Sequence, residues 1–188
     1  MTSLPHFTRL SIVLHWMMAV LVLAMLFIGI GMVASVTERY HLLVAIHRPL
    51  GIAILLLVIV RIVNRLRHAP PPLPAHMQWW ERLAAKASHL VLYALMLLQP
   101  LVGWAMLSAG AYPVVLFGSL HLPPILPESA GLYAFLRGAH TYLALLLFLT
   151  FLAHLGAALL HGLIYRDGVL ASMTTWRRQR VADRISAG

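Results

Sequence analysis

The residues of this sequence that could do chemistry are its histidines, several of which lie within long apolar segments. The chain has eleven histidines and no cysteine. Without cysteine it can form no disulfide, no thiolate-held iron–sulfur cluster and no cofactor linkage through a Cys-x-x-Cys-His motif. Any redox cofactor would therefore have to be held by other side chains, and imidazole is a suitable ligand.

Three of the histidines, His140, His154 and His161, lie in one apolar segment toward the C-terminus. On an α-helix that turns about 100° per residue, separations of fourteen and seven residues leave rotations of only about 40° and 20°. All three side chains are therefore expected on one helix face. The fourteen residues between His140 and His154 also rise about 21 Å, which places these two at different depths of a bilayer.

Histidines in the other apolar segments can be paired with these by depth. His47 begins the second segment, level with His140, whereas His15 lies a few residues into the first segment, level with His154. His89, near the start of the third segment, is an alternative partner for His154. A haem in a helical bundle takes one axial imidazole from each of two facing helices. Two pairs at two depths predict two haems: an outer one on His47 and His140, and an inner one on the other pair.

A single histidine near a helix end is more often an interfacial residue than a ligand. Four helices that each carry an inward histidine, at two matching depths, are harder to explain in that way. Arg61 follows His47 by fourteen residues, on the same helix face at the inner side, where its guanidinium could pair with a haem propionate. A topology-setting role explains Arg61 equally well.

Four apolar segments position these histidines, and each is long enough for the roughly 20 residues that cross a hydrocarbon core. We expect helices at about residues 11–33, 47–66, 87–107 and 140–165, because lipid requires every backbone group to bond internally. Only 10% of the residues are charged, against about 25% in soluble domains. The sequence therefore predicts an all-α membrane protein, built as a bundle of four transmembrane helices.

The lysines and arginines predict how this bundle is oriented. Eleven of the 14 fall on one side of the four segments, and Arg39, Arg48 and Arg137 fall on the other. By the positive-inside rule, both termini and the central loop are cytoplasmic. Topology thus explains the net charge of +9, and we expect no nucleic-acid partner. The connection 108–139, rich in proline and aromatic residues, is expected to form a periplasmic cap between the third and fourth helices.

Several short motifs follow one another in a fixed order along the chain. They are Arg9 followed by Leu14-His15-Trp16, His47 followed by Gly51, Arg61 and Arg65, the proline-rich run 70–74, His89 with Tyr93, Pro100-Leu101-Val102-Gly103-Trp104, Phe117-Gly118, and His140, His154 and His161. No single motif is specific, but the ordered series resembles the bacterial cytochrome b561 family. That family is related to the cytochrome b subunits of nickel–iron hydrogenases and formate dehydrogenases.

The resemblance implies one cytochrome b561-type transmembrane domain over residues 1–180, followed by a flexible basic tail at 181–188. It also implies two non-covalent b haems in the bacterial inner membrane, linked to quinone. In the branch that looks like superoxide oxidase, electrons pass from superoxide at the outer haem to ubiquinone. By position, the haem ligands are matched by His15, His47, His140 and His154. An inner-side quinone pocket is matched by His89 and His161.

Two interpretations of the function follow. The first is a superoxide:ubiquinone oxidoreductase, in which Arg48 and Arg137 could attract the anionic donor to the outer haem or could equally pair with haem propionates. The second is a membrane-anchoring cytochrome b subunit that accepts electrons from a periplasmic dehydrogenase or c-type cytochrome docked on 108–139. Ala139 bears on this choice, because relatives in the superoxide oxidase branch often carry an aromatic residue at that position. A histidine-lined metal or proton transporter is disfavoured, since the four apolar segments contain no acidic residue.

Overall fold

A computed structural model of the protein describes residues 7–74, 77–116 and 118–174, and this part of the chain is mostly helical. Its body consists of the long helices α1 (Arg9–Ala34), α2 (Glu38–Arg67), α3 (Trp79–Ala109) and α4 (Ala130–Leu159). A π-helix, η1 (Leu160–Tyr165), continues α4, and the short helix α5 (Ala171–Thr174) follows. Within the described residues, four helices are long and apolar enough to cross a membrane. The expected bundle of four helices long and apolar enough to span a membrane is therefore confirmed, whereas a small β hairpin between α3 and α4 departs from the expected all-α fold.

Three of the four helices begin well before the apolar segments that predicted them. α2 begins at Glu38 rather than 47, α3 at Trp79 rather than 87, and α4 at Ala130 rather than 140. Polar caps start two of these extensions, because Glu81 accepts a hydrogen bond from the backbone N–H of Gln78 and the Ser129 hydroxyl accepts one from that of Leu132. Hydropathy locates only the turns that lie in hydrocarbon, so it misses helical turns that extend into the interface.

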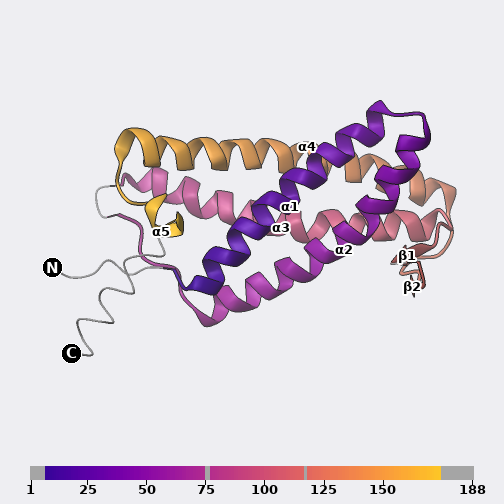
Figure 1. Ribbon diagram of the computed structural model, residues 1–188, viewed down its shortest axis with the longest axis horizontal. Helices are drawn as coiled ribbons and strands as arrows, with labels where there is room; N and C mark the ends of the chain where they lie inside the picture. The colour runs from indigo at the N-terminus through magenta and orange to yellow at the C-terminus, as the bar shows by residue number, and fades with distance from the viewer. Residues whose placement is uncertain (1–6, 75–76, 117, 175–188) are drawn as a thin grey trace.

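The four long helices run between two ends of the elongated molecule (Figure 1). One end carries α5, together with the start of α1 and the end of α2, and is called the α5 end below. The other carries a β hairpin and is called the hairpin end. The hairpin pairs β1 (Val114–Leu116) with β2 (Leu120–Leu122) in antiparallel register, and it belongs to the connection between α3 and α4. Helix α1 packs against α2, α2 against α3, and α3 against α4.

The buried core lies midway along the bundle and receives side chains from all four helices. It consists of Met18, Val22, Ile54, Leu55, Val58, Leu95, Met96 and Leu147. Large apolar side chains also cover the outside of the bundle, such as Val20 and Leu149, which are 64% and 62% exposed. An apolar exterior of this kind is suited to lipid, which does not drive such side chains inward. The core thus separates the two ends, where the histidines gather.

Candidate functional site

At the hairpin end, His47 of α2 faces His140 of α4. The centres of their rings are 6.1 Å apart and their planes meet at 69°. Gly103 of α3 makes room for this arrangement, because a Cβ at that position would lie 3.0 Å from Cε1 of His140. Gln99, one turn earlier, donates its amide N–H to the backbone carbonyl of His140 at 2.9 Å. His47 and His140 are called the hairpin-end pair below.

Three polar atoms of this site are buried without a hydrogen-bond partner in the described part of the chain: Nδ1 of His47, Nδ1 of His140 and Oε1 of Gln99. Buried polar atoms are nearly always paired, so each exception calls for an explanation such as a ligand that completes the site. Each unpaired buried group costs about 1–3 kcal/mol. Three such groups at one place therefore strongly indicate that a ligand completes this site.

At the α5 end, three histidines from three helices meet. His15 of α1 faces His154 of α4, with ring centres 6.3 Å apart and planes at 62°. His89 of α3 lies on another side of His154, with ring centres 5.3 Å apart. The Ser88 hydroxyl lies 3.4 Å from Nδ1 of His154. His15 and His154 are called the α5-end pair below.

Arg61 of α2 lies directly beside this pair. Its Nη2 donates to Nδ1 of His15 at 2.8 Å, and its Nε donates to the Tyr93 hydroxyl at 3.0 Å. The guanidinium of Arg65, one turn further along α2, lies 5.6 Å from the centre of the Tyr93 ring. Two cations and a phenol from α2 and α3 thus border the histidines at this end.

The two facing pairs fit a bis-imidazole iron centre. Metal–imidazole bonds of about 2 Å on each side, plus about 1 Å from each nitrogen to its ring centre, separate the ring centres by roughly 6 Å. The observed 6.1 and 6.3 Å agree with this value, whereas the 5.3 Å between His89 and His154 is shorter.

The contact between Arg61 and His15 bears on this fit. A guanidinium only donates hydrogen bonds, so Nδ1 of His15 accepts here and Nε2 carries the proton. An imidazole that ligates through Nε2 instead carries its proton on Nδ1. Iron binding by His15 would therefore release Nη2 of Arg61 to another acceptor, for which a haem propionate is suited.

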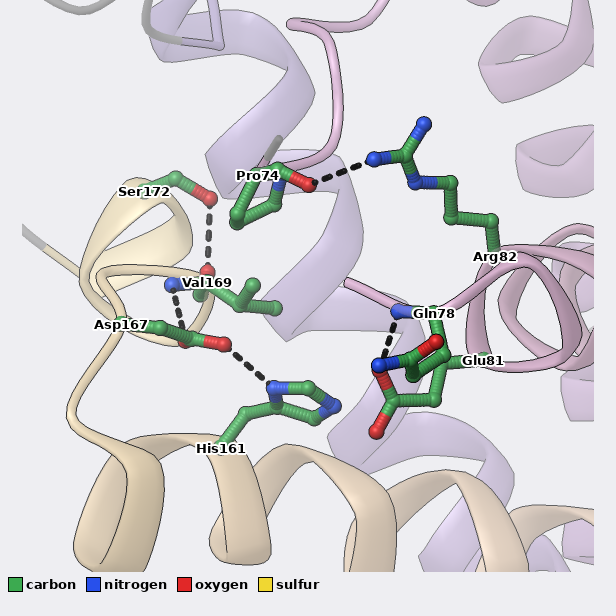
Figure 2. A network of polar contacts seen from close by, with 8 residues as sticks. All are labelled: Pro74, Gln78, Glu81, Arg82, His161, Asp167, Val169 and Ser172. Atoms are coloured by element: carbon green, nitrogen blue, oxygen red, sulfur yellow. Dashed lines mark hydrogen bonds and ion pairs between the residues drawn. The ribbon is translucent and has the colours of Figure 1, made fainter. Parts of the chain in front are cut away.

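His161 does not join the histidine cluster at the α5 end but pairs with an acidic residue. Its Nδ1 lies 2.5 Å from Oδ2 of Asp167, in the segment that follows η1 (Figure 2). Asp167 was not predicted from the sequence, although it is an isolated acidic residue just after the last apolar segment. Gln99 was not predicted either, although it is a lone amide within the third apolar segment.

The cationic residues expected at the hairpin end differ in their surroundings. Nη1 of Arg48 donates to the carbonyl of Pro113 at 3.4 Å, which links α2 to the residue before β1. Arg137 is exposed on α4, nearly one turn before His140. Nearby, Nε1 of Trp104 donates to the carbonyl of Pro123 at 3.1 Å, which ties α3 to the far side of the hairpin.

Comparison with known proteins gives a family for this chain. The family model for prokaryotic cytochrome b561 matches residues 6–176. The chain is 30% identical to cytochrome b561 homolog 2 of Escherichia coli (strain K12), over 87% of this chain and 88% of that protein. It is 26% identical to cytochrome b561 homolog 1 of the same organism, over 92% and 99% of the two chains. It is also 29% identical to the probable superoxide oxidase CybB of Yersinia pestis, over 92% and 97%. The chain therefore belongs to the prokaryotic cytochrome b561 family of multi-pass bacterial membrane proteins, which bind haem b and transfer electrons.

Proposed function

We propose that the protein is a di-haem b-type cytochrome that takes electrons from superoxide at the hairpin end and passes them to ubiquinone at the α5 end. The observation that carries the proposal is the presence of one facing histidine pair at each end, with ring centres 6.1 and 6.3 Å apart. Membership of the family and the similarity to a probable superoxide oxidase support it.

In this proposal His47 and His140 hold the outer haem, and His15 and His154 hold the inner one. When bound, haem b supplies one-electron redox chemistry. The 5.3 Å between the rings of His89 and His154 argues against a shared iron, which leaves His89, with His161, for the quinone. Arg61 is assigned to an inner haem propionate, because its guanidinium already reaches into this site.

The basic residues support the orientation. We assign the α5 end to the cytoplasm and the hairpin end, with its cap, to the periplasm of the inner membrane. The transmembrane domain is assigned to residues 1–180. The tail at 181–188, which was expected to be basic but has one arginine and one aspartate, lies outside the described residues. Arg48 and Arg137 then raise the local concentration of an anion at the periplasmic end.

The overall reaction balances as two superoxide anions, one ubiquinone and two protons giving two molecules of oxygen and one ubiquinol. Each superoxide loses one electron and becomes O₂. The chain's own contribution is to attract the anion at one end, to hold the two redox centres, and to bind and protonate the quinone at the other end. Separating the two half-reactions by the length of the bundle keeps the quinol away from the donor side.

The exposed part of the cap supports a second candidate function. Leu120, the first residue of β2, is 54% exposed, and Tyr112, shortly before β1, is 51% exposed. A periplasmic dehydrogenase or c-type cytochrome could dock on such an apolar surface. The protein would then be a membrane-anchoring subunit that receives electrons from that partner.

A single preparation tests both candidates. Pyridine haemochrome quantification on the purified protein should give two b haems per chain. Superoxide generated beside the oxidised protein should reduce these haems, a dismutase should prevent it, and added ubiquinone should reoxidise them. Haems that stay oxidised, or that reduce equally well with the dismutase present, would refute the superoxide assignment in favour of the docking subunit. One haem or none would refute the di-haem proposal itself.

A further inference from the structure

The chain folds back over His161 after the last membrane-spanning helix. The reversal uses left-handed backbone at Arg166 (φ 50°) and Gly168 (φ 86°). It brings Leu170 directly against Gly162, where an added Cβ would lie 2.3 Å from Cδ2 of Leu170. Because only glycine permits such an approach, the returning segment lies close against η1.

This returning segment is fixed at several points. The Ser172 hydroxyl donates to the carbonyl of Val169 at 2.7 Å. The N–H of Val169 donates in turn to Oδ1 of Asp167 at 3.1 Å. Nε1 of Trp16, on α1, donates to the carbonyl of Met173 at 2.8 Å. The contacts of this segment therefore fix the position of the Asp167 carboxylate, in addition to the hydrogen bonds that the carboxylate itself makes.

Asp167 and His161 form a close, shielded pair at this position. Oδ2 of Asp167 lies 2.5 Å from Nδ1 of His161, and their side chains are only 2% and 12% exposed. π-Helical turns within α-helices are frequent at functional sites, and His161 lies in one. A shielded carboxylate that accepts the Nδ1–H bond fixes the orientation of the ring and keeps a proton on Nδ1, so that Nε2 faces away from the carboxylate.

The other ring nitrogen of His161, Nε2, points away from Asp167. Figure 2 shows it directed to the side on which Gln78 and Glu81 lie, at the start of α3. Among the described residues, the ionisable groups near the ring include Asp167, Tyr165, whose ring centre is 5.1 Å away, and Glu81 and Arg82 at the start of α3. Oε2 of Glu81 accepts a hydrogen bond from the backbone N–H of Gln78 at 2.8 Å. Nε2 is thus the nitrogen that can exchange a proton with a ligand.

We propose that Asp167 and His161 form a proton-donating dyad for the quinone, an assignment that rests on the proposed function. His161 is the catalytic residue, and Asp167 is the positioning residue that acts through it. For each proton delivered, the Nε2–H bond breaks and an O–H bond of the quinol forms. The ring is left neutral, with its Nδ1–H still on Asp167, and a proton from the aqueous side restores it. The two electrons come from the two superoxide anions oxidised at the hairpin end.

The test compares Asp167→Asn with Asp167→Glu and with a matched control, Glu128→Gln, which removes an exposed carboxylate at the other end of the molecule. All are purified with haem bound, reduced with a stoichiometric chemical reductant and mixed with a soluble ubiquinone analogue. Haem reoxidation is followed by stopped flow across pH and quinone concentration. Imidazole ¹⁵N NMR of the oxidised proteins, with the His161 signal identified by its loss in His161→Gln, reports which ring nitrogen carries the proton.

We expect Asp167→Asn to lower kcat for quinone reduction by tenfold or more, toward the roughly 10²-fold that a general acid typically contributes. The quinone KM should change little, and the ring proton should no longer be confined to Nδ1. Asp167→Glu should recover part of kcat, and Glu128→Gln should match the wild type. An unchanged kcat in Asp167→Asn, or an unchanged ¹⁵N spectrum, would overturn the dyad. The proposed function would be overturned instead if quinone did not reoxidise the reduced haems of the wild-type protein while the proton on Nδ1 of His161 still depended on Asp167.

Discussion

Gly103 offers a direct test of the hairpin-end pair, because it limits where the ring of His140 can lie. A Cβ at this position would come within 3.0 Å of Cε1 and 3.4 Å of Nδ1 of His140, whereas ordinary contacts begin at 3.4 Å. Gly103→Ala therefore requires the ring to move by about 0.4 Å, the difference of these two distances. Functional groups need to be held within about 0.5 Å of their working geometry, so alanine is marginal. Gly103→Val, with two more methyl groups, should exceed this limit.

Overpacking of this kind typically costs about 1–3 kcal/mol. At 1.4 kcal/mol per factor of ten, the outer haem should bind about 5- to 140-fold more weakly. We expect haem content to fall from two toward one per chain in Gly103→Val, with a smaller loss or a spectral shift in Gly103→Ala. The control is Gly138→Ala, two residues from His140, where an added Cβ meets nothing within 4 Å.

Pyridine haemochrome assays and reduced-minus-oxidised spectra measure this directly, and the inner haem serves as an internal standard for folding. Two haems with unaltered spectra in Gly103→Val would mean that His140 is not the ligand in the position described. An equal loss in Gly138→Ala would mean that a general weakening of the bundle, rather than contact with His140, is responsible.

Replacing His89 with alanine should leave two haems per chain, because its ring is too close to His154 to share an iron; loss of the inner haem would make it the ligand instead of His15. Arg48→Gln and Arg137→Gln should each raise the superoxide KM several-fold at low ionic strength and flatten its salt dependence, measured by stopped flow. A salt dependence equal to that of the wild type would contradict this. Arg61→Gln should lower the midpoint potential of the inner haem, by about 59 mV for each 1.4 kcal/mol of lost interaction, and spare the outer one in a redox titration. Equal shifts of both potentials would contradict a local effect.

The sequence was sufficient to predict four helices long and apolar enough to cross a membrane, and to predict that His47 lies near His140 and His15 near His154. The rotation of about 100° per residue, used to place His140 and His154 on one helix face, holds over their whole separation because α4 is an uninterrupted α-helix between them. From His154 to His161 only the last step lies in the π-helix that begins at Leu160, so the helix geometry changes mainly after His161. This change in helix type was not predicted from the sequence.

Contacts that depend on chain reversal were not predictable in the same way. The pairing of His161 with Asp167 requires left-handed backbone at Arg166, a conformation that non-glycine residues seldom adopt. Gly168 predicts that the chain turns at this position, but it does not predict the direction in which the chain continues. The contact between Gln99 and the backbone of His140 likewise depends on how α3 and α4 are aligned, which hydropathy does not specify.

The two histidine pairs lie in different electrostatic surroundings, and this difference gives the proposed electron path a direction. A redox centre becomes more negative when it gains an electron, so a fixed cation beside it stabilises the reduced form. At the hairpin end the nearest guanidinium, that of Arg48, makes an exposed contact where water and salt screen it. At the α5 end the guanidinium of Arg61 is partly buried against His15, where screening is weaker. Electrons that enter at the hairpin end are therefore favoured at the α5 end, where His161 would supply the protons that their transfer to quinone requires.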